Sequence, residues 1–155
     1  MSTATTPTSI SSQKIIFSKI LVGIDGSDES MHAADYALSL CNEYNAELYA
    51  LHVIRSDVDL FGSHETSEYM TAMRDKGKKY LDKVRLKANE KNIQTKTEII
   101  SSINIAGGIV DYAESNNVNL IVVGTRGLSG FKKLLLGSNA AHVITYAHCP
   151  VLVVK

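Results

Sequence analysis

The sequence predicts an α/β protein with one open parallel sheet and helices on both faces, a Rossmann-like arrangement. Short apolar runs alternate with longer segments whose apolar residues recur at helical spacing, and this alternation is typical of stacked βαβ units. The chain has 155 residues, which is the usual size of a single domain. Its composition is 45% hydrophobic and 21% charged, with only 2 prolines, which excludes a largely disordered chain.

Five apolar runs have the length and residue types of buried strands. The first, 20–24, consists almost entirely of Ile, Leu and Val, as expected of a strand that is covered on both faces. It ends at the polar turn Asp25-Gly26-Ser27. The other predicted strands are 47–54, 95–100, 120–124 and 150–154. All of these runs are far shorter than the roughly 20 apolar residues that a membrane-spanning helix requires.

Four helices are predicted between these strands. Ser27 is a suitable N-cap for the first, at about 28–44, because acidic residues follow it in the first turn. A long amphipathic helix is predicted at 66–92, after a polar surface loop at 55–65. Its lysines are interleaved with acids, which favours a solvated face over a binding patch. The last two helices are predicted at 105–115, despite the Gly107-Gly108 pair, and at 138–147.

The charge balance and the N-terminal segment exclude several classes of protein. Lys plus Arg and Asp plus Glu both number 16, so no net positive field attracts a nucleic-acid backbone or an anionic membrane. Residues 1–13 are rich in Ser and Thr and lack the basic and apolar regions of a secretory signal. We therefore expect a disordered tail at 1–13, a folded domain at 14–155, and a cytoplasmic protein with no nucleic-acid or membrane partner.

Cysteine and histidine spacing indicates neither a redox pair nor a metal centre. Cys41 and Cys149 have no paired spacing, which favours two buried free thiols. The histidines stand at 32, 52, 64, 142 and 148, without the spacing of metal ligands. We therefore expect no metal site made by the protein alone.

A glycine-punctuated loop follows the fourth predicted strand. Glycines stand at 124 and 127, and after nine further residues Gly137-Ser138 opens the last helix. Glycines let backbone N–H groups approach a polyanion, and a helix N-terminus adds unpaired donors and a positive dipole. The residue order differs from the Walker loop and from the dinucleotide GxGxxG motif. Spacing alone leaves both phosphate binding and simple turn chemistry open.

Three features together resemble the universal stress protein family, and the glycine spacing resembles its ATP-binding branch. They are Asp25-Gly26-Ser27 after the first strand, the pattern Gly-x2-Gly-x9-Gly-Ser at 124–138, and the closing Cys-Pro-Val-Leu-Val-Val at 149–154. The resemblance covers about residues 19–155. It implies a twisted five-stranded parallel sheet of order 3-2-1-4-5 and a homodimer, for which we expect the C-terminal strand to supply the contact.

The resemblance also implies a site for ATP, or for ADP or AMP, with Mg²⁺ held through the phosphate oxygens. Asp25 is expected to bond the ribose hydroxyls. Backbone atoms of Gly23, Ile24 and Val53 are expected to line the adenine pocket. The phosphates are expected to lie against Gly124, Arg126 and Gly127 in the loop and against Gly137, Ser138 and Asn139 at the helix start.

Each assignment has a simpler alternative, and two positions depart from the family pattern. Asp25 could only support the turn into the first helix, Arg126 could be a solvated loop cation, and Ser138 could be only an N-cap. Ala140 lacks the hydroxyl that family members commonly have there, which predicts a weaker hold on a triphosphate. Residues 102–104 lack the glycine that usually precedes the third helix, which makes that turn the weakest part of the fold prediction.

The expected function is that of a nucleotide-dependent regulatory or stress-response module. Hydrolysis is expected to be slow or absent, because the sequence shows no nucleophile and general base in a recognisable motif. Two alternatives remain: an enzyme that acts on an adenine-nucleotide phosphate, and a structural dimer that no longer binds nucleotide. Rapid turnover of ATP identifies the first alternative, and a lack of nucleotide affinity identifies the second.

Overall fold

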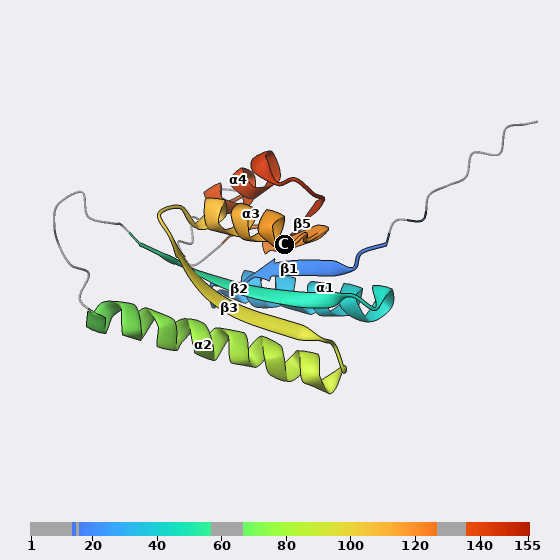
Figure 1. Ribbon diagram of the computed structural model, residues 1–155, viewed down its shortest axis with the longest axis horizontal. Helices are drawn as coiled ribbons and strands as arrows, with labels where there is room; N and C mark the ends of the chain where they lie inside the picture. Colours follow the sequence, from blue (N-terminus) through green and yellow to red (C-terminus); the bar gives the residue numbers. More distant parts are fainter. Residues whose placement is uncertain (1–13, 15, 57–66, 127–135) are drawn as a thin grey trace, which may run out of the picture.

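The five predicted strands form one parallel sheet in the order β3-β2-β1-β4-β5 (Figure 1). The computed structural model describes residues 14, 16–56, 67–126 and 136–155. The strands are β1 Lys19–Gly23, β2 Glu47–Arg55, β3 Thr95–Ser102, β4 Leu120–Gly124 and β5 Val151–Val154. The predicted fold class and strand order are therefore confirmed, and the strand ends differ from the predicted ones by at most two residues.

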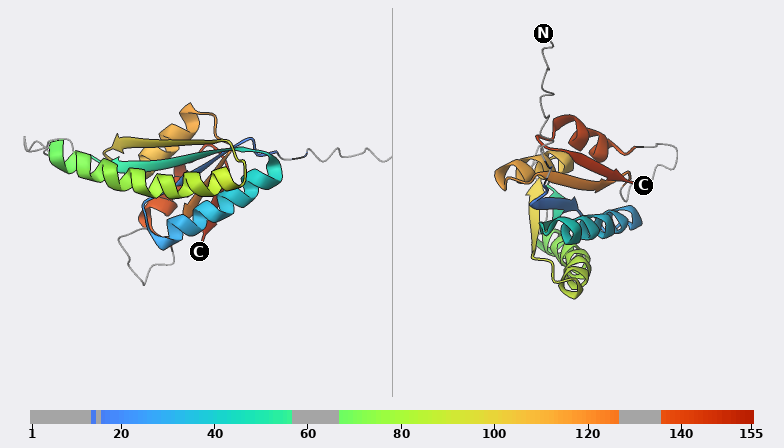
Figure 2. Two further views of the ribbon diagram at one scale, coloured as in Figure 1. Left: turned by 90° about the horizontal axis from the view of Figure 1, so that it is seen from below. Right: turned by 90° about the vertical axis from the view of Figure 1, so that its right-hand side faces the viewer.

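Two helices cover each face of the sheet (Figure 2). The helices α1 Asp28–Tyr44 and α2 Ser67–Glu90 pack on one face, and α3 Ile105–Ser115 and α4 Ser138–Tyr146 pack on the other. The chain adds β2 and β3 outward on one side of β1 and then returns to add β4 and β5 on the other side. Since crossovers between parallel strands are right-handed, this reversal moves the second pair of helices to the opposite face.

The reversal brings the carboxyl ends of β1 and β4 together. Val22 of β1 pairs with Val122 of β4, so both strands end within two residues of this pair. On its other side β1 pairs with β2, with Gly23 beside Leu51. In open parallel sheets a crevice forms beyond the strand ends at such a reversal, because the loops there diverge to opposite faces.

Each layer of helices has its own apolar core, because successive strand residues point to opposite faces. Ile20 and Val22 face the first core, with Leu38 of α1 and Val84 of α2. Leu21 and Ile121 face the second core, which α3 and α4 cover. Ala34, Leu38 and Cys41 of α1 and Leu81, Val84 and Ala88 of α2 recur at helical spacing and are buried, whereas Met31, Met70, Met73 and Tyr80, at the same spacing, are only partly buried.

Side chains cap the starts of α1 and α3, and the sequence predicted only the first of these caps. Ser27 caps α1, as predicted, by accepting a hydrogen bond from Ser30 N at 3.1 Å. The turn before α3 forms without the expected glycine, because Asn104 caps that helix by accepting from Gly107 N at 2.9 Å. Ser102 Oγ also donates to Asn104 O at 2.8 Å. The turn before α3 is thus held by side chains of Ser102 and Asn104.

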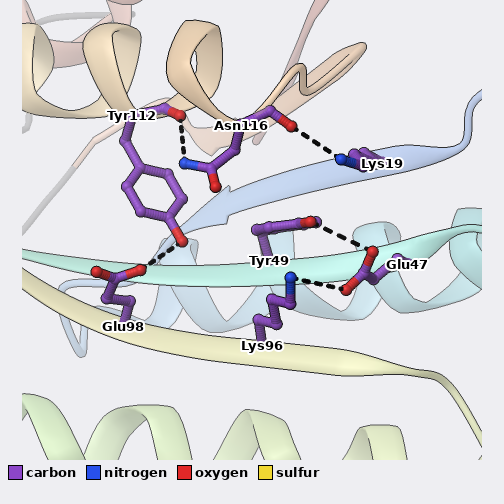
Figure 3. A network of polar contacts seen from close by, with 7 residues as sticks. All are labelled: Lys19, Glu47, Tyr49, Lys96, Glu98, Tyr112 and Asn116. Carbon is purple, nitrogen blue, oxygen red and sulfur yellow. Dashed lines mark hydrogen bonds and ion pairs between the residues drawn. The ribbon is translucent and has the colours of Figure 1, made fainter.

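A polar network lies on the α3 face of the sheet towards the amino-terminal ends of β1, β2 and β3 (Figure 3). Tyr49 is buried, and its hydroxyl donates to Glu47 Oε2 at 3.2 Å, while Lys96 Nζ lies 3.7 Å from Glu47 Oε1. Tyr112 OH donates to Glu98 Oε2 at 2.7 Å. Burial, together with that carboxylate, raises the pKa of Tyr112 above its ordinary value. Tyr112 therefore stays neutral and acts as a hydrogen-bond donor to Glu98.

Some predictions lie outside the described residues or are only partly met. The tail at 1–13 and most of the loop at 55–65 fall outside them. Cys41 and Cys149 are both free, as predicted, but only Cys41 is buried and Cys149 is partly exposed. Within the part of the chain that the structure describes, no helix is both long and apolar enough to cross a membrane.

Candidate functional site

The turn after β1 is held by its own side chains. Asp25 Oδ1 accepts hydrogen bonds from Ser27 N at 2.9 Å and from Ser27 Oγ at 2.5 Å. Between these residues Gly26 has a φ of +84°, a left-handed conformation that strongly favours glycine. Asp25 therefore supports the turn into α1, as the simpler interpretation of this residue predicted. The same bonds hold its carboxylate in one orientation at the carboxyl end of β1.

The end of β4 packs against the first turn of α1. A Cβ atom on Gly124 would lie 3.0 Å from the backbone C and O of Glu29. Close packing therefore favours glycine at 124, whether or not a phosphate binds there. Arg126 Nη2 lies 4.0 Å from Glu29 Oε1, and the two side chains are 38% and 31% exposed. Arg126 is thus a partly exposed cation in a weak ion pair, at the boundary between β1 and β4.

The start of α4 is joined to the end of β4. Gly137 N donates to Thr125 O at 2.6 Å, and a Cβ atom on Gly137 would lie 3.0 Å from that same oxygen. The two ends of the glycine loop therefore meet. Gly127 lies outside the described residues, with the rest of 127–135.

Among the described residues, no side chain caps the first turn of α4. Gly137 is its N-cap, and Ser138 is its first helical residue, so the interpretation of Ser138 as an N-cap is wrong. By contrast, side-chain oxygens of Ser27 and Asn104 accept from the first turns of α1 and α3. Among these three described N-caps, only that of α4 leaves the first turn without such an acceptor. Unpaired N–H groups at a helix start favour an anion.

The three residues expected near adenine lie at the ends of β1 and β2. Ile24 N donates to Leu51 O at 2.8 Å, which continues the pairing of the two strands beyond Gly23. Val53 is buried on the α3 face. Gly23 also faces α3, because a Cβ atom there would lie 3.3 Å from Ile109 Cδ1. The structure therefore brings the described candidate residues to one end of the sheet, on both sides of the reversal.

The sequence analysis missed two side chains that pack against this end from the α2 side. His52 Nδ1 lies 2.7 Å from Ile24 O. The Tyr80 ring lies against Gly26, where an added Cβ would come within 2.4 Å of Tyr80 Cζ. A lone histidine in a strand and a tyrosine on the apolar side of a helix carry no motif, so no sequence signal could have identified these contacts.

Among the described residues, neither a cavity nor a group of acidic side chains forms a second site whose chemistry can be recognised. A groove of about 280 Å³ lies between α2 and β3, beside Arg74, Lys78 and Arg85. A second hollow of about 330 Å³ lies beside Asn45 and Lys91, at the end of the sheet opposite the candidate site. Neither is lined by a candidate residue. The described part of the chain contains no group of three or more His, Cys, Asp or Glu side chains placed to hold a metal ion.

Comparison with known proteins gives one consistent result. The profile of the universal stress protein family matches residues 17–155. The chain is similar to universal stress protein MJ0531 of Methanocaldococcus jannaschii, with 40% identity over 90% of this chain and 83% of that protein. It is also similar to universal stress protein YxiE of Bacillus subtilis, with 40% identity over 90% of this chain and all of that protein (100%).

Solved structures agree with this match. The structure of protein MJ0577 has a TM-score of 0.81 and 27% identity, and the match covers 91% of this chain and 97% of that one. Two more distant structures share the fold and hold nucleotides. A universal stress protein in complex with cAMP has a TM-score of 0.71, 24% identity and coverage of 91% and 99%. An Arabidopsis thaliana family member with AMP bound has a TM-score of 0.67, 22% identity and coverage of 89% and 91%.

Proposed function

The chain belongs to the universal stress protein family, and we propose that it binds an adenine nucleotide at the carboxyl ends of β1 and β4. The observation that carries this proposal is the convergence of the Asp25 turn, Arg126 and the uncapped start of α4 at the sheet reversal. The nucleotides bound by two proteins of this fold are adenine nucleotides. We propose ATP as the ligand, with ADP and AMP as alternatives, in a regulatory module of the ATP-binding branch.

The proposed orientation follows from the chemistry at each part of the site. The fixed carboxylate of Asp25 suits the ribose hydroxyls, which are hydrogen-bond donors. The strand ends at Gly23, Ile24 and Val53 suit the adenine ring. The phosphates suit the other end, where the N–H groups of the first turn of α4 and the cation of Arg126 favour negative charge. The described residues at this end are Gly124, Arg126, Gly137, Ser138 and Asn139, and we propose that Gly127, outside the described residues, also contacts the phosphates.

Triphosphate binding is proposed to be weaker than in relatives with a hydroxyl at position 140. Ala140 is 5% exposed and packs in the core between α3 and α4. It therefore contributes packing and no hydrogen bond. Mg²⁺ is proposed to bind through phosphate oxygens and water, because the described residues form no metal cluster. We propose that the chain acts as a regulatory module that hydrolyses ATP slowly or not at all.

Variants of Asp25 test the site and separate its two roles. Asp25→Asn keeps Oδ1 as the acceptor for the Ser27 bonds but removes the charge and one acceptor. We expect it to lower AMP affinity about tenfold, the effect of losing one charge-assisted hydrogen bond, with little change in thermal stability. Asp25→Ala also breaks the turn, so we expect a further loss of affinity together with lower stability. Titration calorimetry with AMP and with ATP plus Mg²⁺ measures both effects.

The matched control is Asp111→Asn, on the exposed surface of α3, for which we expect unchanged affinity. No detectable binding by the wild-type chain at millimolar nucleotide overturns the proposed site. Equal affinity of wild type and Asp25→Asn overturns the ribose role and leaves Asp25 with the turn alone. Release of ADP at about 1 s⁻¹ or faster, a typical enzymatic rate, contradicts the regulatory module and favours an enzyme.

We also propose a homodimer that pairs through the outer edge of β5. This strand is at the edge of the sheet, and Val151, Leu152 and Val153 are all partly exposed although apolar. The N–H groups of Ile121 and Thr125 donate to the carbonyls of Pro150 and Val154. Even-numbered residues of β5 therefore bond to β4, and the odd-numbered ones point their backbone groups outward. An unpaired apolar edge is a ready surface for a second copy.

Val153→Pro tests this dimer without breaking the sheet. Proline at 153 removes an outward N–H and leaves the bonds to β4 intact, since proline is tolerated on the open side of an edge strand. We expect a dimeric wild type and a monomeric variant with unchanged secondary structure, measured by light scattering after size exclusion. Val153→Thr keeps the outward N–H and a similar shape, so we expect it to remain dimeric. A dimeric Val153→Pro contradicts this contact.

A further inference from the structure

His52 makes a direct hydrogen bond to the backbone of Ile24, one of the residues proposed to line the adenine pocket. It lies on β2 and is half-buried, and its Nδ1 is 2.7 Å from Ile24 O. A carbonyl oxygen can only accept, so Nδ1 carries the hydrogen and donates it. Ile24 itself is 2% exposed and immediately precedes Asp25. The imidazole therefore fixes the last peptide group before the Asp25 turn.

Helix α2 holds the imidazole in place from behind. Its Gly77 lies so close to His52 that an added Cβ would come within 2.4 Å of His52 Cδ2. Three residues further along the helix, Tyr80 packs its ring edge-on to the imidazole, with the centroids 5.8 Å apart. The same tyrosine ring covers Gly26. Residues three apart lie on one side of a helix, so one turn of α2 contacts both the imidazole and the Asp25 turn.

We propose that His52 is a positioning residue of the nucleotide site, and that through it α2 sets the backbone conformation on which adenine and ribose binding depends. This inference rests on the nucleotide site proposed above. Without the Nδ1–H donor, Ile24 O loses its hydrogen-bond partner in a buried position, which is costly. The segment from Ile24 to Gly26 then shifts toward other partners, and the Asp25 carboxylate shifts with it.

Two substitutions at position 52 separate the donor from the packing. His52→Phe keeps a ring between β2 and α2 but removes the donor, and we expect AMP affinity to fall about tenfold. His52→Asn places an amide N–H where Nδ1 lies, so we expect its affinity to remain within about threefold of wild type. Titration calorimetry at a temperature where far-ultraviolet circular dichroism shows each variant folded gives the comparison.

The matched control is His148→Phe. The His148 ring also bonds a backbone carbonyl, with Nε2 3.0 Å from Val118 O, but it lies at the opposite end of the sheet, before β5. We expect its loss to lower thermal stability and to leave AMP affinity unchanged. A purely structural role for His52 predicts the same outcome for His52→Phe, so an affinity equal to wild type in that variant overturns the positioning role alone.

Nitrogen-15 NMR of the wild-type histidine rings gives a readout that does not depend on variant folding. We expect the His52 ring in the nucleotide-free protein to give the signature of the Nδ1–H tautomer, with a slowly exchanging ring proton whose resonance shifts when AMP is added. An Nε2–H tautomer, or a resonance that AMP leaves unmoved, overturns the proposal. A wild-type chain that binds no AMP overturns the nucleotide site, and the positioning role with it.

Discussion

Gly26→Ala is expected to lower the free energy of unfolding by about 3 kcal/mol, the sum of backbone strain and overpacking. Gly26 has a φ of +84°, and a left-handed conformation costs about 1–2 kcal/mol for a residue with a Cβ. The new methyl group would also lie 2.4 Å from Tyr80 Cζ, so the tyrosine ring or the turn must move. Urea denaturation followed by circular dichroism measures the change.

A double-mutant cycle with Tyr80→Ala divides this loss into its two causes. In the Tyr80→Ala background the ring is absent, so only the strain of the left-handed backbone remains. We expect Gly26→Ala to cost about 1–2 kcal/mol there. An equal cost in both backgrounds means that Tyr80 does not restrain the turn. A total cost below about 1 kcal/mol contradicts the left-handed conformation itself.

The first strand was predictable because it is buried and is followed by a clear stop signal. The segment 20–24 is apolar throughout and is followed by Asp25-Gly26-Ser27, so the end of the strand and the start of α1 are both fixed by local chemistry. Gly107 and Gly108 were expected to weaken α3, yet the helix forms. Gly108 is buried, and a Cβ there would lie 3.1 Å from Val53 Cγ1. Close packing against β2 thus favours the glycine that lowers helix propensity.

The candidate site was less predictable, because its glycines serve more than one purpose. The spacing of Gly124 and Gly137 predicts a phosphate-binding loop, but both also stand where a side chain would press on backbone atoms. Their presence in the sequence is therefore weaker evidence for a ligand than the spacing suggests. Asp25 likewise serves the turn through its bonds to Ser27. Sequence patterns cannot separate a packing requirement from a binding role when one residue satisfies both.

Contacts between distant elements were beyond any local pattern. His52 and Ile24 are 28 residues apart, and Gly77 lies beside His52 because α2 packs on the face of the sheet to which His52 points. The network around Tyr49 and Tyr112 depends in the same way on neighbouring strands and on α3. Such contacts follow from the strand order, and the chemistry that they add could not be derived before the helices were placed.

Gly77→Ala is the second substitution with a large expected effect. We expect it to destabilise the chain, although alanine has a higher helix propensity than glycine. Alanine in a helix interior normally gains about 1 kcal/mol over glycine. At position 77 the new methyl group would lie 2.4 Å from His52 Cδ2. The imidazole cannot swing aside without breaking its 2.7 Å bond to Ile24 O. We therefore expect a net loss of about 2 kcal/mol in the free energy of unfolding.

Gly107→Ala is the matched control, because it is also a helical glycine but has ordinary space, with its nearest neighbour 3.6 Å from an added Cβ. We expect it to gain up to about 1 kcal/mol in the same urea experiment. In a His52→Ala background the obstacle to Gly77→Ala is gone, so we expect that substitution to become neutral or stabilising. If it destabilises the chain equally in both backgrounds, the imidazole is not what limits position 77. If Gly77→Ala destabilises the chain in neither background, α2 does not hold His52 against Ile24. The proposed link between α2 and the Asp25 turn is then wrong.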